Sequence, residues 1–272
     1  MTKKTGQINV KKIDFKSNNI NLNAYFYKGT GNKKKPTVVW LQGNPGGHED
    51  GTNPWSVDLA KKGVNIFRFN YEGLWGNEGK FNFTNSLLNL KSAVDFLNKK
   101  INSELYQIDT KNLIFGGFSF GSSVAFVGAM YDKRIKNIVA VSLCDHGYFG
   151  RQFMDPYSKI REFLEQVTKQ IFLPDGVVSQ EKEIFVKDLT DNLDRYDFVQ
   201  HAEKLLKKKI LIISGYNDEV CPVEDHLLPL YRKLKMLGHK DLKVIINDCA
   251  HVPEVDLAEV FLNHIKESKS KV

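Results

Sequence analysis

Short apolar segments that alternate with helical segments are the feature that most constrains how this chain can fold. Six of these segments are nearly continuous runs of apolar side chains, and they are residues 37–41, 64–69, 112–118, 135–143, 209–214 and 242–246. Helical apolar spacing follows several of them, at residues 87–97, 223–237 and 254–266. Apolar runs of this length are typical of strands buried on both faces, and helices between them favour a mostly parallel sheet. We therefore predict an α/β fold with helices on both faces of the sheet.

The N-terminal part of the chain has a different pattern. Residues 10–15 and 20–27 alternate apolar and polar side chains around Ser17, Asn18 and Asn19. This alternation predicts an antiparallel hairpin with one face exposed to water.

Residues from about 145 to 200 interrupt the alternation, because no buried strand is evident there. Helical patterns occur instead at residues 156–171 and 179–188, together with many aromatic residues. We predict a small helical cap insertion over the end of the sheet; the alternative is that its aromatic side chains only pack it onto the body. No Pro/Gly/Ser-rich linker divides the chain, so we expect a single domain over residues 1–272.

Gly117, Ser119 and Gly121 form the pattern Gly-x-Ser-x-Gly where a buried strand ends and a helix begins. A serine at such a sharp turn presents its hydroxyl clear of the backbone, and small residues two positions before and after relieve the crowding. Ser119 is therefore the candidate nucleophile. The alternative is a glycine-rich turn without a catalytic role.

A serine nucleophile needs a histidine base and an orienting carboxylate, which follow it in the order acid and then histidine in this architecture. Asp218 follows the strand at residues 209–214, and His251 follows the strand at residues 242–246. Parallel strands carry such loops at one edge of the sheet, so we predict a Ser119–Asp218–His251 triad. The rival carboxylates are Glu219, Asp248 and, above all, Asp145.

Other histidines and aromatic residues are candidates for weaker roles. His48 and His146 lie in predicted loops at the same edge, and we consider them with Phe149 and Phe153 as substrate contacts; surface or packing positions are the alternative. His226, His239 and His264 lie on predicted helices or at their ends, where we expect solvated or capping side chains.

An oxyanion hole must complete such a site, because removing one of its donors lowers turnover roughly 10²- to 10³-fold. The glycine-rich segment at residues 42–47 follows the first buried strand and allows backbone to approach a ligand. We predict the backbone N–H groups of Asn44 and Phe120 as donors. The alternative for the segment is a tight turn.

With these motifs the sequence resembles the α/β-hydrolase superfamily over nearly its whole length, and most of all small esterases and prolyl-oligopeptidase-like or dienelactone-hydrolase-like serine hydrolases. The segments at residues 68–79 and 215–222 carry the likeness besides the serine motif. The resemblance implies an eight-stranded, mostly parallel sheet and hydrolysis through an acyl-enzyme without a cofactor. The chain departs from relatives at Gln42, where many have His, at Glu72, where Arg is frequent, and at Trp75, where Gly is frequent.

Composition and charge indicate which classes of partner this protein binds. The net charge is +7, but the lysines form short runs at predicted helix ends and turns, without zinc-finger or RNP-like patterns. The N-terminus has no apolar segment of a signal peptide, and the three cysteines follow no metal-binding spacing. We expect a cytoplasmic protein from a reducing compartment, with no nucleic acid, membrane, metal or cofactor, and a homodimer is compatible with the sequence.

The predicted function is hydrolysis of small-molecule carboxylic esters, with small or aromatic acyl groups because the insertion is limited in size and rich in aromatic residues. Peptides or acylaminoacyl compounds and thioesters are the alternative substrates. A catalytically idle binding protein is the non-enzymatic alternative, since a fold does not establish a function.

Overall fold

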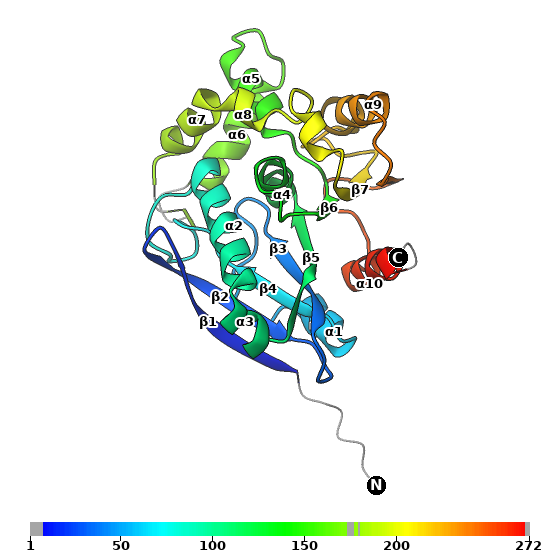
Figure 1. Ribbon diagram of the computed structural model, residues 1–272. Coiled ribbons are helices and arrows are strands. Elements are labelled where there is room, and N and C mark those ends of the chain that lie inside the picture. Colours follow the sequence, from blue (N-terminus) through cyan, green and yellow to red (C-terminus); the bar gives the residue numbers. More distant parts are fainter. Residues whose placement is uncertain (1–7, 173–176, 179, 270–272) are drawn as a thin grey trace.

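The computed structural model describes residues 8–172, 177–178 and 180–269 (Figure 1). An eight-stranded sheet runs through the molecule in the order β1-β2-β4-β3-β5-β6-β7-β8. The two N-terminal strands pair antiparallel, and β2 also pairs antiparallel with β4. All other neighbours in the sheet are parallel. The predicted α/β fold with a mostly parallel eight-stranded sheet is confirmed.

The N-terminal hairpin consists of β1 (Asn9–Ser17) and β2 (Ile20–Lys28). Asn18 and Asn19 form its two-residue turn, with φ angles of 48° and 65°. Two-residue hairpin turns require such positive φ angles, and asparagine tolerates them better than most residues. The predicted hairpin and its turn are therefore both present.

The parallel part of the sheet has nearly the predicted strands, namely β3 (Lys35–Leu41), β4 (Asn65–Phe69), β5 (Ile108–Phe118), β6 (Asn137–Val141), β7 (Lys209–Gly215) and β8 (Leu242–Asn247). In β4 every residue is buried. Burial on both faces explains why the inner strands are continuous apolar runs, whereas β8, at the edge of the sheet, is only partly buried.

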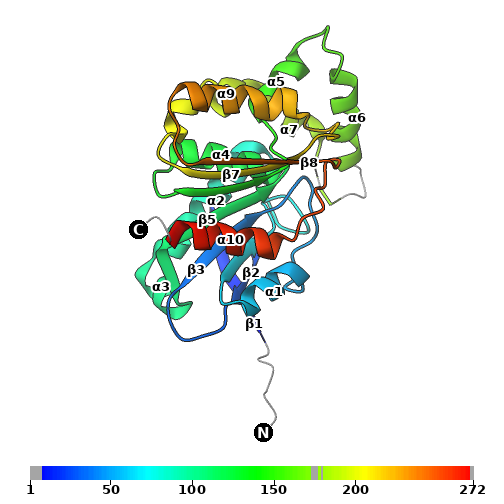
Figure 2. The same ribbon diagram turned by 90° about the vertical axis from the view of Figure 1, so that its right-hand side faces the viewer.

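Helices cover both faces of the sheet (Figures 1 and 2). On one face, α1 (Pro54–Lys61) and α10 (Leu257–Lys269) pack around the rings of Trp40, Trp55 and Phe261. On the other face pack α2 (Phe83–Asn98), α4 (Phe120–Tyr131) and α9 (Leu228–Met236). The short α3 (Lys100–Leu105) follows α2. A 3₁₀ turn at Ala202–Leu205 and a π-helical turn at Val223–Leu227 complete this part.

Four helices lie between β6 and β7, where we predicted a helical insertion: α5 (His146–Met154), α6 (Arg161–Ile171), α7 (Lys182–Asp191) and α8 (Leu193–Tyr196). We refer to these four helices as the cap insertion, and they gather beyond one end of the sheet (Figure 1). The predicted helix at residues 156–171 starts later, at Arg161. Residue 179, the predicted start of the next helix, lies outside the described residues, and α7 begins at Lys182.

Aromatic side chains attach the cap insertion to the body. Phe185 of α7 stacks on Phe81 with a ring distance of 5.6 Å, and Phe81 lies 5.1 Å from Phe120 at the start of α4. Asp188 accepts hydrogen bonds from the backbone N–H and the hydroxyl of Thr84, at the start of α2. The packing alternative of the sequence analysis thus accounts for much of the aromatic content of the insertion.

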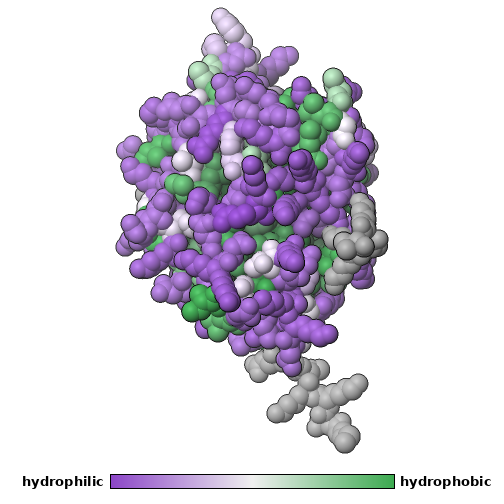
Figure 3. All heavy atoms as spheres, in the orientation of Figure 1, coloured by the Kyte–Doolittle hydropathy of each residue, from purple (hydrophilic) through white to green (hydrophobic). Residues whose placement is uncertain are grey.

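The surface of the molecule is mostly polar. Hydrophilic side chains cover most of the face shown in Figure 3, and hydrophobic ones are scattered over it. Among the residues that the structure describes, no helix is both long and apolar enough to cross a membrane.

Candidate active site

Ser119 lies at the turn between β5 and α4, with a φ angle of 51°. A non-glycine residue seldom adopts this backbone conformation, which stores strain at functional turns. The two flanking positions are glycines for a steric reason. A Cβ on Gly117 would lie 2.2 Å from the carbonyl carbon of Gly121, and a Cβ on Gly121 would lie 2.1 Å from the carbonyl oxygen of Leu41. Neither position can hold a larger residue without displacing backbone.

His251 connects Ser119 to Asp218, although the three residues lie far apart in the sequence. Its Nε2 lies 2.9 Å from Ser119 Oγ, and its Nδ1 lies 2.9 Å from each carboxylate oxygen of Asp218. The Asp218 side chain is fully buried, whereas 21% of the His251 side chain is exposed. The three residues predicted as a triad are therefore brought together in the geometry that such a triad requires.

Backbone groups hold the Asp218 carboxylate in place. Its Oδ1 accepts hydrogen bonds from the N–H groups of Val220 (3.0 Å) and Cys221 (2.8 Å) in the same loop. A hydrogen-bonded, buried carboxylate can orient an imidazole and stabilise its protonated form. The loop at residues 215–222, which we call the acid loop, thus holds Asp218 in a fixed orientation toward His251.

The rival carboxylate, Asp145, has a different task. It is the N-cap of α5, and its Oδ1 accepts from the N–H groups of Gly147 (2.9 Å) and Tyr148 (3.2 Å). Burial raises the pKa of Asp145 to about 7, and the negative charge of Asp197 adds to this. Its carboxylate caps a helix, and the carboxylate bonded to His251 is that of Asp218.

The two predicted oxyanion donors come from separate segments of the chain. Phe120 is the first residue of α4, where the initial N–H groups of a helix have no partner within the helix. Asn44 belongs to the loop between β3 and α1. This loop runs close to the turn, because Gly43 lies against the ring of Phe118, where a Cβ would be only 2.9 Å from the ring.

The predicted substrate contacts fall into two groups. His48 is exposed and stacks on Trp75, with a ring distance of 5.4 Å, and Phe153 is half-buried. His146 and Phe149, in contrast, are buried in α5, with exposed fractions of 5% and 8%. His146 hydrogen-bonds to Ser123 at 2.7 Å, and burial lowers its pKa to about 3. His48 is therefore accessible on the loop between β3 and α1, whereas His146 is enclosed. Phe153 borders a hollow within the cap insertion, beside Arg161 and Thr168.

We expected solvated or capping side chains at His226, His239 and His264, and the solvated alternative is wrong. Their exposed fractions are only 1%, 5% and 3%. His239 lies after the end of α9, and its Nε2 is 3.1 Å from the carbonyl oxygen of Leu205. His226 accepts a hydrogen bond from the N–H of Asp145 at 2.9 Å, beside the rings of Tyr148 and Phe149. Helical position alone did not reveal which face of each helix is buried.

Two contacts near the site were not predicted. Cys144, three residues after the end of β6, forms a disulfide bond with Cys221 in the loop that carries Asp218. Ser142 has a φ angle of 52° and donates its hydroxyl to the carbonyl oxygen of His251. The two cysteines are 77 residues apart, and no spacing rule pairs them. Only the adjacency of β6 and β7 in the sheet brings them together.

No group of three or more His, Cys, Asp or Glu side chains within the described residues could hold a metal ion. The chemistry available at the site is that of a serine hydroxyl, an imidazole, a carboxylate and backbone N–H groups.

The strand order, the serine at the turn after β5 and the Ser–His–Asp arrangement define an α/β-hydrolase fold. The chain belongs to the family described as BAAT / Acyl-CoA thioester hydrolase C terminal, whose model matches residues 90–255, more than half of the chain. Ser119, Asp218 and His251 all lie within the matched segment.

Individual relatives are distant. The quorum-quenching protein AidA of Acinetobacter baumannii is 22% identical over 151 residues, which are 55% of this chain and 49% of that protein. Pyrococcus horikoshii acylaminoacyl peptidase is structurally similar, with a TM-score of 0.68 and 19% identity over 97% of this chain and 41% of that one. A Pyrococcus furiosus esterase has a TM-score of 0.59 and 20% identity, over 97% of this chain and 91% of that one. The chain therefore spans about half the length of the first two proteins, and the structural likeness extends to the fold.

Proposed function

We propose that this protein is a serine hydrolase that cleaves carboxylic esters through an acyl-enzyme intermediate. The observation that carries the proposal is the continuous hydrogen-bonded series from Ser119 Oγ through both nitrogens of His251 to the Asp218 carboxylate. An unactivated serine hydroxyl is a poor nucleophile, and this arrangement is the usual means of activating it.

In the proposed mechanism, His251 Nε2 accepts the hydroxyl proton while Ser119 Oγ attacks the ester carbonyl. The backbone N–H groups of Phe120 and Asn44 stabilise the oxyanion, and Asp218 stabilises the imidazolium. His251 then protonates the departing alcohol, which leaves an acyl group on Ser119. A water molecule, deprotonated by His251, releases the carboxylic acid and restores the serine.

Esters of small or aromatic acids remain our first choice of substrate. Phe153, in the cap insertion, is half-buried and is a candidate for contact with an acyl group, and His48 with Trp75 provides a stacked aromatic surface on the oxyanion side. Aromatic surfaces favour apolar and flat groups through burial and ring–ring contact.

Thioesters are the second candidate, because the matching family is described by acyl-CoA thioester hydrolysis and its matched segment contains the whole Ser–His–Asp arrangement. The chemistry at Ser119 would be the same, with a thiol in place of the alcohol as the leaving group. A direct comparison of substrates decides between the two.

The proposal is tested with p-nitrophenyl esters, aryl esters, acyl-CoAs and aminoacyl amides, combined with labelling by a fluorophosphonate. We expect ester turnover and one labelled peptide containing Ser119, and both should disappear in Ser119→Ala. The matched control is Ser103→Ala, which changes a buried serine of α3 and should leave both intact. Faster turnover of acyl-CoAs would favour the thioesterase. A folded protein with neither turnover nor label would refute the enzymatic function.

A further inference from the structure

The loop that carries the Asn44 N–H borders an open pocket. Residues 42–49, which we call the oxyanion loop, lie beside a cavity of about 460 Å³. Gly43, Gly46 and Gly47 border this cavity on one side, and Phe118 and Pro253 border it on others. Gly43 at the start of the loop packs against Phe118, but a Cβ on Gly47 would meet no atom within 4 Å, so the middle of the loop has few packing contacts. Its position must therefore depend on how its two ends are held.

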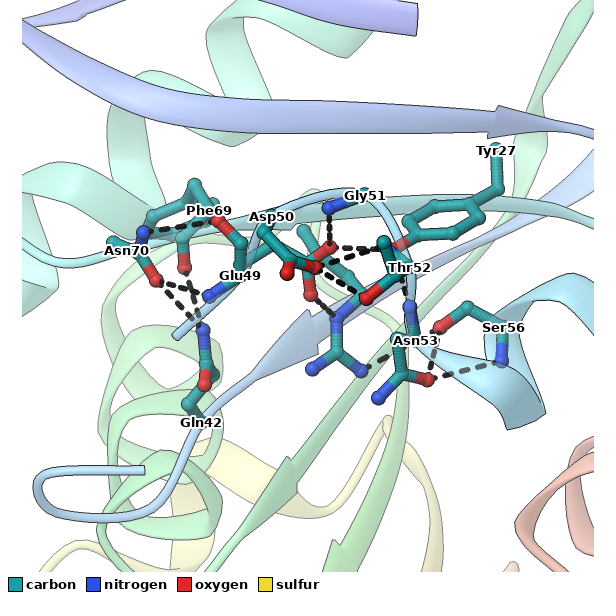
Figure 4. Close-up of polar contacts among 11 residues, drawn as sticks. Tyr27, Gln42, Glu49, Asp50, Gly51, Thr52, Asn53, Ser56, Phe69 and Asn70 are labelled. Atoms are coloured by element: carbon teal, nitrogen blue, oxygen red, sulfur yellow. Dashed lines mark hydrogen bonds and ion pairs between the residues drawn. The ribbon is translucent and has the colours of Figure 1, made fainter. Parts of the chain in front are cut away.

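Asn70 connects both ends of the oxyanion loop (Figure 4). Its Oδ1 accepts hydrogen bonds from Gln42 Nε2 (3.1 Å) and from the N–H of Glu49 (2.9 Å). Its Nδ2 donates to the carbonyl oxygen of Glu49 at 3.2 Å. Asn70 directly follows β4, and only 1% of it is exposed. A single buried amide side chain thus links the two ends of the loop.

Glu49 is in turn held by its side chain, which is almost completely buried. The carboxylate forms an ion pair with Arg68 of β4 and accepts hydrogen bonds from the Tyr27 hydroxyl and the N–H of Gly51 (Figure 4). Burial, together with Glu49, raises the pKa of Tyr27, so the hydroxyl remains a donor. The Arg68 guanidinium also lies over the ring of Trp55, 5.3 Å from its centre.

A buried ion pair of this kind is poorly explained by stability alone. Removing two charges from water is expensive, and apolar residues of similar size frequently stabilise a fold equally well. What the pair provides is a defined orientation, because the guanidinium fixes one carboxylate oxygen while Tyr27 and Gly51 fix the other. Catalysis requires such definition, since a donor displaced by about 1 Å can lose a factor of ~10² in rate.

We propose that Asn70, supported by the Glu49–Arg68 ion pair, is a positioning residue that holds the Asn44 N–H in the oxyanion hole. This inference rests on the proposed function. Asn70 does not touch the reacting atoms, and it acts through the loop that it closes.

The decisive comparison is between two buried asparagines at opposite ends of the same strand. Asn65, the first residue of β4, is also fully buried and also joins separate loops, through Gly29 and Tyr106. It lies at the end of the sheet away from Ser119. Asn70→Ala and Asn65→Ala therefore remove the same amide from similar surroundings, and only the first removes a contact to the oxyanion loop.

We expect Asn70→Ala to lower kcat for an ester by about 10- to 100-fold per active site with little change in KM. Binding of a trifluoromethyl ketone, which forms an oxyanion on Ser119, should weaken by a similar factor, whereas an unreactive ether analogue should bind as before. Asn65→Ala should lower thermal stability but leave kcat and ketone binding within about twofold of the wild type. Asn70→Asp keeps both acceptor contacts and should retain intermediate activity, which provides a second variant if Asn70→Ala does not fold.

Equal kcat per active site and equal ketone affinity in Asn70→Ala and the wild type would overturn the positioning role while leaving the proposed function intact. If Asn70→Ala did not fold, wild-type kcat in Asn70→Asp would overturn it in the same way. A wild-type protein without ester turnover or fluorophosphonate labelling would instead refute the proposed function, and this inference with it.

Discussion

Two carboxylates lie close to the candidate site, and their environments separate their roles. Asp218 receives the imidazole of His251 and two backbone N–H groups of its own loop. Asp145 accepts hydrogen bonds from backbone N–H groups of the described residues, and burial raises its pKa to about 7. A carboxylate that is neutral for much of the pH range cannot stabilise an imidazolium well, whereas the Asp218 geometry suits that task.

Substitutions test whether Asp218 or Asp145 is the carboxylate that orients His251. Ser119→Ala and His251→Ala should reduce ester turnover by about 10⁴-fold or more, and Asp218→Asn should approach this loss. Asp145→Asn should retain most of the activity, because asparagine caps a helix as well as aspartate does. Steady-state kinetics on purified, folded variants checks this. Inactivation by Asp145→Asn alongside an active Asp218→Asn would contradict the assignment of the acid.

The stability of the folded protein should depend on the protonation of Asp145. The pKa of Asp145 is raised from 3.8 to about 7 by burial, so the folded state binds a proton that the unfolded state has released. The stability that this proton provides is complete below about pH 4 and is lost as the pH rises toward 7. The midpoint temperature of thermal unfolding of Asp145→Asn should therefore rise progressively relative to that of the wild type over this interval, because asparagine does not ionise. A constant difference between the two proteins from pH 4 to 8 would show that Asp145 does not titrate in this way.

At the scale of elements, the ends of neighbouring strands are tied together around the site. The Cys144–Cys221 disulfide joins the end of β6 to the acid loop after β7. Ser142, also after β6, binds the carbonyl oxygen of His251. The N–H of Cys221 also donates to the Asp218 carboxylate, so this crosslink lies within the loop that orients the acid.

We therefore expect that removing the disulfide lowers the free energy of unfolding. A crosslink closing a loop of this length contributes about 2–5 kcal/mol, largely by restricting the unfolded chain. Urea unfolding should show this loss for Cys144→Ala with Cys221→Ala, and dithiothreitol should destabilise the wild type but not the double variant. Cys249, which is free, provides the control, because Cys249→Ala should leave the effect of dithiothreitol unchanged. Equal stability of the double variant and the wild type would contradict the prediction.

At the scale of the whole molecule, the cap insertion shares its core with the body. Phe185 and Tyr196 of the insertion belong to the same buried cluster as Phe83 and Phe120, and Phe83 lies 4.4 Å from Tyr196 between ring centres. Elements that share a buried core cannot separate without exposing apolar surface of both. The ion pair between Arg151 and Asp197 adds a contact within the insertion itself.

A single cooperative unfolding transition is expected from this shared core. With Trp75 replaced by Phe, Trp40 and Trp55 report on the body. Phe153→Trp would place a probe in the cap insertion, in a background where Trp40, Trp55 and Trp75 are all replaced by Phe. The urea midpoints from both fluorescence signals and from far-UV circular dichroism should coincide. Separate midpoints would instead indicate that the cap insertion unfolds as a unit of its own.

Predictions from the sequence were accurate where a local pattern carries the information. Buried strands are apolar runs of limited length, so β3 to β8 could be located to within a few residues. The short helices α1 and α5, of 8 and 9 residues, were not predicted. The Asn53 N-cap of α1 and the Asp145 N-cap of α5 are local signals that could have indicated both of them.

Ser119, Asp218 and His251 could be proposed from the sequence because each follows a recognisable strand and the order of the three along the chain is restricted. By itself the sequence determined the strand and helix pattern, the serine turn and its glycines, since these depend on neighbours in the chain. Only the tertiary structure decided the Cys144–Cys221 pairing, the burial of His146 and the connection of the oxyanion loop by Asn70. These contacts join residues that are distant in sequence, and their geometry arises from packing across the sheet and leaves no periodic signal in the chain.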